Sequence, residues 1–170
     1  MTATSPGRNH ATGTPDTTRW LDPDEMAAWR NYVDCGGALE QALEVDLQCF
    51  GLTMGDYEVL VYLSEVADHR MRMCDLAVRL RLSPSGLTRR LDGLVKSGVV
   101  GRQPSEDDRR VMLAVLTDQG YELLQRAAPH HVASVRRHLI DVLSPAEVRA
   151  IGSAFGKVRE ALAARNNGCP

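Results

Sequence analysis

Hydrophobic residues recur every three or four positions along most of the chain, and this spacing predicts a mainly helical protein. The first predicted helix begins with Asp22 as its N-cap and Pro23 in its first turn, and it runs to about Phe50. The pair Gly36-Gly37 predicts a bend or a close helix contact within it. Five more helices are predicted, starting at Thr53 and Ser144 and covering residues 71–82, 83–98 and 117–141.

Two runs rich in β-branched residues, 99–103 and 111–116, interrupt the helical pattern. The polar segment 104–108 between them suits the turn of a β-hairpin. The predicted fold class is therefore mainly α with a small β-hairpin wing.

The predicted helices over residues 71–82 and 83–98 form a pair joined by a tight turn. Ser83 and Pro84 suit the N-cap and first position of the second helix. One stripe of that helix is apolar and consists of Leu87, Leu91, Leu94 and Val95. The polar residues that we expect to contact DNA lie on its other faces and at its start: Ser83, Ser85, Thr88, Arg89, Arg90 and Lys96. The pattern predicts a helix-turn-helix, although an ordinary helical hairpin would share the apolar stripe.

The net charge of the chain is only −2, but its charges are unevenly distributed. Residues 70–110 carry ten basic and five acidic side chains, whereas residues 1–69 carry three basic and twelve acidic ones. Such clustering is expected of a phosphate-binding surface, although a solvated basic face would give the same count.

The predicted hairpin carries two arginines beside its acidic turn. Arg109 and Arg110 follow Asp108, and a loop-borne arginine can enter the narrow minor groove of DNA. We expect Asp108 to pair with Arg110, which would leave Arg109 free to contact DNA. A helix-turn-helix followed by such a hairpin is a winged helix.

These motifs, in this order and spacing, resemble the MarR family of bacterial winged helix-turn-helix transcription regulators. The segments that carry the resemblance are 52–54, 57–60, 76–80, 83–94, 98–100, 107–110 and 116–120. The resemblance implies a homodimer whose first and last two helices interlock and whose two winged lobes bind a pseudo-palindromic operator in duplex DNA. It also favours repression. A cytoplasmic protein is expected from the cysteines, because their wide spacing without a C-x-x-C pair fits reduced thiols in a cytosol.

The predicted organisation follows from this resemblance and from the pattern. We expect a disordered arm over 1–20, a helical dimerisation region over 21–52 and 118–165, a DNA-binding lobe over 53–117, and a tail over 166–170. The last helix supports the dimer, because its apolar residues are spaced like a coiled-coil seam, which needs a partner. They are Val148, Ile151, Phe155, Val158 and Leu162.

The family resemblance also implies release from DNA by a small phenolic or anionic ligand, or by oxidation of a cysteine. Trp29, Tyr32 and Tyr57 are candidates to line a ligand cleft, although packing is the alternative for each. Neither Cys35 nor Cys49 lies near the start of the first helix, where the hydroperoxide-sensing branch of the family keeps its reactive thiol. Buried, structural thiols are the default expectation for the four cysteines Cys35, Cys49, Cys74 and Cys169.

Other classes of protein find less support in the sequence. It contains no nucleophile–base arrangement, no phosphate-cradling glycine loop and no metal signature, so we predict no enzyme and no cofactor. Its histidines are expected on the surface or in packing. No apolar run is long enough for a membrane helix. A winged-helix module that binds protein remains the alternative, but it would not need the arginine-rich face and wing.

Overall fold

The computed structural model describes residues 18–166. Most of the predicted arm over 1–20 lies outside these residues, as do the end of the predicted tail and Cys169. The chain divides into two compact units, residues 1–35 and 36–170, and each is described by itself.

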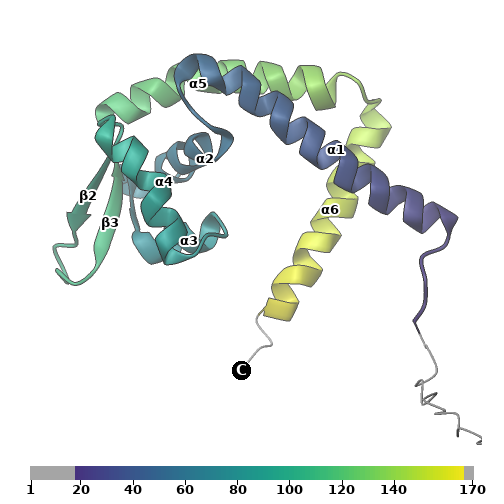
Figure 1. The fold of residues 1–170 in the computed structure, drawn as a ribbon, viewed down its shortest axis with the longest axis horizontal. Helices are drawn as coiled ribbons and strands as arrows, with labels where there is room; N and C mark the ends of the chain where they lie inside the picture. Colours follow the sequence, from purple (N-terminus) through teal and green to yellow (C-terminus); the bar gives the residue numbers. More distant parts are fainter. Residues whose placement is uncertain (1–17, 167–170) are drawn as a thin grey trace, which may run out of the picture. The chain divides into compact units, whose positions relative to one another are not determined.

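The first unit contains the start of the long helix α1 (Pro23–Leu47) (Figure 1). The Asp22 carboxylate accepts a hydrogen bond from the Glu25 amide at 2.8 Å, and the Glu25 carboxylate accepts one from the Asp22 amide at 3.0 Å. This reciprocal cap confirms the predicted helix start. The helix then continues without interruption through Gly36-Gly37 into the second unit.

The second unit contains the rest of α1 and all later elements. In chain order these are η1 (Gln48–Phe50), α2 (Met54–Ser64), η2 (Ala67–His69), β1 (Arg70–Arg72), α3 (Met73–Arg79), α4 (Pro84–Lys96), β2 (Val100–Pro104), β3 (Met112–Leu116), α5 (Asp118–Val135), η3 (Arg136–Ile140) and α6 (Pro145–Asn166). The short elements η1 and η2 are 3-10 helices, and η3 is a π-helical turn. No helix among residues 18–166 combines the length and the hydropathy needed to cross a bilayer.

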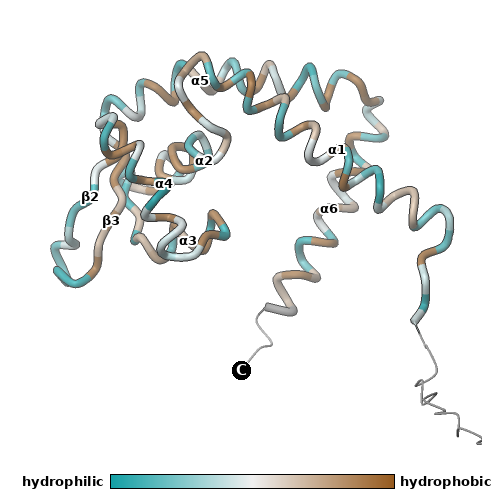
Figure 2. The backbone as a smooth tube through the Cα atoms, in the orientation of Figure 1, coloured by the Kyte–Doolittle hydropathy of each residue, from teal (hydrophilic) through white to brown (hydrophobic). Residues whose placement is uncertain are grey.

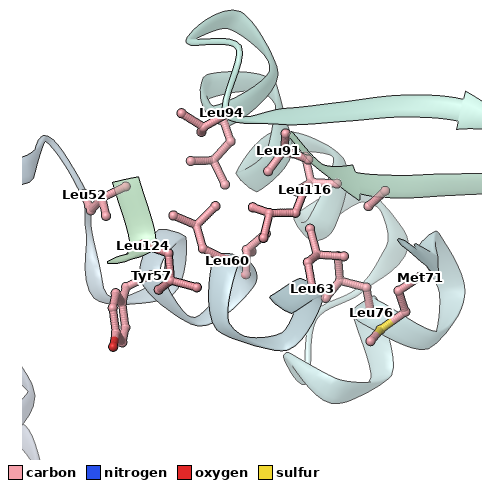
Figure 3. Close-up of a cluster of buried hydrophobic side chains, with 14 of the residues drawn as sticks. Leu52, Tyr57, Leu60, Leu63, Met71, Leu76, Leu91, Leu94, Leu116 and Leu124 are labelled. Atoms are coloured by element: carbon pink, nitrogen blue, oxygen red, sulfur yellow. The ribbon is translucent and has the colours of Figure 1, made fainter. Parts of the chain in front are cut away.

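Helices α2, α3 and α4 gather beside the β-sheet and enclose the core of the lobe (Figure 1). Leu60, Leu63, Leu76 and Leu91 are fully buried, and their side chains converge with those of neighbouring residues in Figure 3. Burying a leucine side chain contributes about 1.5–3 kcal/mol, so this cluster fixes the three helices against one another.

The sheet has three antiparallel strands in the order β1-β3-β2, whereas the sequence predicted only the β2–β3 hairpin. The additional strand, β1, lies where the sequence predicted the start of a helix. Its three residues are too few to show an alternating pattern, and pairing with β3 forms the strand. Met71, at its centre, is buried in the core. The tube in Figure 2 is hydrophilic at the turn between β2 and β3, as expected for a solvent-exposed wing tip.

A polar cluster joins the end of α1 to the end of α5. The Asp46 carboxylate accepts hydrogen bonds from the hydroxyl of the fully buried Ser134 and, at 2.5 Å, from the Arg137 guanidinium. His138 Nε2 lies 3.5 Å from the same carboxylate. The Ser134 hydrogen bond, followed by the contacts with Arg137 and His138, holds the pKa of Asp46 below its usual value.

Candidate nucleic-acid interface

Helix α4 has one buried and one exposed face, as the sequence predicted. Leu87, Leu91 and Leu94 are each at most 4% exposed and belong to the lobe core. The polar positions turned away from the core are exposed: Ser83, Ser85, Thr88, Arg89, Asp92 and Lys96. Five of these six are predicted DNA-contact residues, so the lobe presents them together on one surface.

The hydroxyl groups at the start of α4 are held by local hydrogen bonds. Ser83 is the N-cap, and its Oγ accepts the Gly86 amide at 3.1 Å and lies 3.2 Å from the Oγ of Ser85. Thr88 Oγ1 donates to the Pro84 carbonyl at 3.0 Å. These contacts orient the hydroxyls while leaving them exposed, which suits contacts with phosphate or base edges.

Arg89 and Arg90 are adjacent in sequence but differ in their surroundings. Arg89 is exposed and makes no hydrogen bond or ion pair with any residue from 18 to 166. Arg90 Nη1 donates to Thr53 Oγ1 at 3.0 Å and lies 3.7 Å from the Asp56 carboxylate. A Cβ atom on Gly55 would lie 2.4 Å from the Arg90 guanidinium carbon, so only glycine leaves the guanidinium its present place. The side chain of Arg90 thus links α4 to the start of α2.

Arg102 of β2 also forms hydrogen bonds with α4. Its Nη2 atom donates to the Thr88 carbonyl at 2.8 Å and to the Asp92 carboxylate at 2.9 Å. Arg102 was not among the residues predicted from the sequence, although its position on the strand gave one signal. Residues two apart on a strand share a face, so Arg102 lies on the same face as the buried Val100.

The wing tip places three predicted residues together. Asp108 Oδ1 accepts a hydrogen bond from the backbone amide of Arg110 at 2.9 Å, and the Asp108 carbonyl accepts one from the Val111 amide at 2.9 Å. The expected pairing of Asp108 with Arg110 therefore occurs through the backbone of Arg110, not through its guanidinium. Arg109 is exposed and makes no hydrogen bond or ion pair within the described chain, as expected.

The start of α5 packs against the backbone that leads into β2. Thr117 caps α5 by accepting the Gly120 amide at 3.0 Å, while its own hydroxyl donates to the Gly98 carbonyl at 2.8 Å. The Thr117 amide donates to the Val99 carbonyl, directly before β2. A Cβ atom on Gly120 would lie 2.0 Å from that carbonyl oxygen. The first turn of α5 is therefore seated directly on the backbone that leads into β2.

The three candidate ligand residues lie in different surroundings. Trp29 and Tyr32 are each 54% exposed in the first unit, with ring centroids 5.9 Å apart. In the second unit, Tyr57 is 7% exposed, and the centroid of its ring lies 4.4 Å from the ring centroid of His131. Figure 3 shows the Tyr57 hydroxyl pointing away from the core cluster. The Tyr57 ring is therefore a packing element, and burial raises the pKa of its hydroxyl.

The remaining histidines and the cysteines require one correction. His130 packs against Phe50 with ring centroids 5.0 Å apart, which agrees with the packing role expected for the histidine pair. Cys35, Cys49 and Cys74 are free and exposed, so the expectation of buried thiols is wrong for these three. Each lies at a helix position outside the buried stripe. Among the described residues, no group of three or more metal-ligating side chains is assembled.

Comparisons with known proteins find relatives that extend over most of the chain. The model of the MarR family matches residues 52–112, from the start of the lobe to the start of β3. AbsC, a MarR family transcriptional regulator from Streptomyces coelicolor, has a crystal structure that matches with a TM-score of 0.81. Its sequence is 46% identical, and the match covers 86% of this chain and 99% of AbsC.

Two further relatives extend this picture. Sco3205, a MarR family transcriptional regulator from Streptomyces coelicolor solved in complex with DNA, is 37% identical with a TM-score of 0.81. That match covers 86% of this chain and 92% of Sco3205. The HTH-type transcriptional repressor YetL of Bacillus subtilis is 25% identical over 156 residues, which are 90% of this chain and 93% of YetL. The winged lobe, the matching family model and the near-complete coverage of AbsC agree: the chain belongs to the MarR family of transcriptional regulators.

Proposed function

We propose that the protein is a sequence-specific DNA-binding regulator that acts as a homodimer on a pseudo-palindromic operator. The observation that carries this proposal is the exposed polar face of α4, which includes Arg89, together with the exposed Arg109 at the tip of the wing. The relative Sco3205 was solved in complex with DNA, which supports the same partner here. Since bacterial chromosomal DNA lies in the cytoplasm, we place the protein there.

Arg89 is the residue that we assign to base contact. It is exposed and has no partner among residues 18–166, and a guanidinium can donate two hydrogen bonds to guanine in the major groove. Ser83, Ser85 and Thr88 precede it on the same surface and suit phosphate or base edges, and Lys96 suits a phosphate. The predicted DNA contact by Arg90 is less favoured, because its guanidinium is already bonded to Thr53.

The wing supplies the second contact. Arg109 projects from a turn whose backbone is fixed by Asp108, and an arginine on such a turn suits the minor groove, where the potential is most negative. Arg110 lies next to it and adds positive charge at the same tip. We therefore assign Arg109 to the minor groove and Arg110 to the flanking backbone.

The dimerisation region is assigned to residues 21–52 and 118–165, and the DNA-binding lobe to residues 53–117. Helix α6 supports this division, because four of its five coiled-coil-like apolar residues are exposed within one chain and the fifth, Val148, is half-buried. Their exposed fractions rise from 36% at Ile151 to 50% at Phe155 and 56% at Leu162. Such a row of exposed apolar side chains on a helix is typical of a surface that a second helix covers. A truncation before Ser144 should yield a monomer by light scattering, whereas a truncated dimer would contradict the assignment.

Repression is the favoured mode of regulation, and the relative YetL is a repressor. Release by a small phenolic or anionic ligand stays a prediction. Trp29 and Tyr32 stay candidates for such a ligand because they are exposed, whereas Tyr57 is engaged in the core. Redox regulation through an exposed cysteine is the alternative within the same fold.

A gel-shift experiment tests the proposal. The purified protein is mixed with duplex DNA that flanks its own gene, in the presence of excess random duplex. We expect a discrete shifted band that survives the competitor and disappears as the salt concentration rises. Failure to shift any duplex, including a random pool enriched by repeated selection, would contradict DNA binding and favour a protein-binding winged helix.

Two substitutions separate the roles of the recognition helix and the wing. Arg89→Ala should weaken operator binding by about 1–3 kcal/mol while leaving random-duplex binding nearly unchanged. Arg109→Ala should weaken both and lower the salt dependence by about one phosphate contact. Arg126→Ala, which removes an exposed arginine of α5 outside the proposed surface, is the matched control. Equal loss on operator and random DNA in Arg89→Ala would show that Arg89 contacts phosphate.

A further inference from the structure

We infer that Arg102 is a positioning residue, which orients the recognition helix for DNA binding without itself contacting DNA. The inference rests on the proposed function and adds a residue to it. A single guanidinium nitrogen, Nη2, donates both to the Thr88 carbonyl at 2.8 Å and to the Asp92 carboxylate at 2.9 Å. One strand of the wing is thereby bonded to the turn of α4 that carries Arg89.

The side chain of Arg102 is directed toward the helix and not toward solvent. It is 27% exposed, and its Nε is buried without a hydrogen-bond partner in the described chain. The residue opposite on β3 is Ala114, which is fully buried and small. Side chains of directly opposed residues lie on the same face of a sheet, so Ala114 leaves room for the arginine stem to pass toward α4. The nitrogen that reaches α4, Nη2, is thus engaged by two acceptors of the helix.

The chemistry of Asp92 supports the same conclusion. Its carboxylate is 60% exposed on the polar side of α4, close to where DNA phosphates are proposed to lie. A carboxylate there repels phosphate, so on charge alone it would weaken DNA binding. The hydrogen bond from Arg102 to this carboxylate compensates for the repulsion, because it holds α4 in position for DNA binding. If Asp92 acts by holding Arg102, removing its negative charge should weaken DNA binding. If it acts only by repelling phosphate, removing the charge should strengthen DNA binding.

The two hydrogen bonds from Arg102 hold the turn of α4 that carries Arg89, the residue assigned to base contact. Thr88 and Asp92 are one helical turn apart and lie on either side of Arg89 in the chain. Hydrogen bonds weaken steeply when their distance or angle changes, and only the contacts to base edges carry sequence information. Removing the hydrogen bonds between Arg102 and α4 should therefore reduce operator affinity more than affinity for random DNA.

The experiment measures operator and random-duplex affinities of the full-length protein by fluorescence anisotropy across a range of salt concentrations. The variants are Arg102→Met, Arg102→Lys, Asp92→Asn and the double variant Asp92→Asn with Arg102→Met. Arg126→Met is the control for loss of an arginine, and Asp107→Asn is the control for loss of an acid. Asp107 lies at the wing tip and has no hydrogen bond or ion pair within residues 18–166. Thermal unfolding establishes that each variant is folded at the assay temperature.

We expect Arg102→Met and Asp92→Asn each to weaken operator binding about three- to tenfold. The double variant should bind no more weakly than Arg102→Met alone, because the charge of Asp92 supports the helix only through its contact with Arg102. Arg102→Lys should recover much of the affinity, since one ammonium can make both bonds that Nη2 makes. The salt dependence should be unchanged in all four, while Asp107→Asn should bind as tightly as the wild type or more tightly.

Two results would overturn the inference. One is tighter operator binding by Asp92→Asn, matching Asp107→Asn, because the charge of Asp92 would then act on DNA directly. The other is a salt dependence in Arg102→Met that falls by about one phosphate contact, because Arg102 would then bind DNA. Absence of wild-type binding to any duplex would instead refute the proposed function, and the inference with it, so the two failures are distinct.

Discussion

Gly120→Ala tests how closely α5 is seated on the wing. The added Cβ would lie 2.0 Å from the Val99 carbonyl oxygen and 2.8 Å from Leu116 Cδ1. Contacts of a Cβ below 3.0 Å are essentially never found, so the carbonyl would have to move by about 1 Å at least. That carbonyl is fixed by the Thr117 amide, so the strain spreads into β2 and α5.

The magnitude follows from two opposing contributions. Inserting a methyl group against fixed backbone costs about 1–3 kcal/mol or more, and the upper part of that range applies here because the obstructing atoms belong to the main chain. Alanine recovers at most about 1 kcal/mol relative to glycine in a helix. We therefore expect Gly120→Ala to lower the free energy of unfolding by about 2 kcal/mol.

The assay is urea unfolding followed by circular dichroism at one fixed protein concentration, because the stability of a dimer depends on concentration. Gly93→Ala in α4 is the matched control, since no atom lies within 4 Å of its added Cβ. The control should be stabilised by about 0.5–1 kcal/mol. Equal stabilisation of Gly120→Ala and Gly93→Ala would refute the close seating of α5 on β2.

Three further predictions concern pH and the link between α4 and α2. Burial lowers the pKa of His131, so wild-type stability should fall as the pH decreases through about 6.5, where the unfolded chain takes up the proton. His131→Phe should lose that part of the pH dependence in urea midpoints measured from pH 8 to 5, and an unchanged dependence would contradict the assignment. The Ser134 hydrogen bond lowers the pKa of Asp46, so its stabilisation is present above about pH 4 and is lost as the pH falls through the lowered value. Asp46→Asn should therefore be less stable than the wild type at pH 7, and thermal unfolding should show this difference closing at acid pH; a constant difference would argue against it. Gly55→Ala should displace the Arg90 guanidinium from Asp56. Arg90→Met should therefore lower the free energy of unfolding by up to about 1 kcal/mol in the wild type and by no measurable amount in the Gly55→Ala background.

The helix starts were predictable because capping is a local interaction. Thr53 and Asp56 form a reciprocal cap, as do Ser144 and Glu147, and the bonds join residues three apart in sequence. Strand β1 was not predictable, because it pairs with β3, where Met71 faces Ala114, more than forty residues later in the chain. A strand of three residues owes its conformation to that partner and not to its own pattern.

The candidate site was predictable to a similar extent. Helical periodicity places Arg89 and Arg90 on or beside the exposed face, and for Arg89 this is correct. Periodicity cannot reveal that Arg90 turns toward α2, because that contact depends on the absence of a side chain at Gly55. The hydrogen bonds from Arg102 to α4 were not predicted either. Its position on the inward face of a strand was visible in the sequence, but its partner on α4 was not.

Helix α6 has a consequence for how the protein is assembled. Among residues 145–164 none is buried, and only Val148 and Gly156 are even partly covered. A helix of this kind is marginal in water when nothing covers it, so its backbone amides should exchange rapidly with solvent in a lone chain. In the proposed dimer they should become protected, and the degree of protection should rise with protein concentration by mass action. Amide exchange along α6 would then report how much of the regulator is assembled at the concentrations found in a cell.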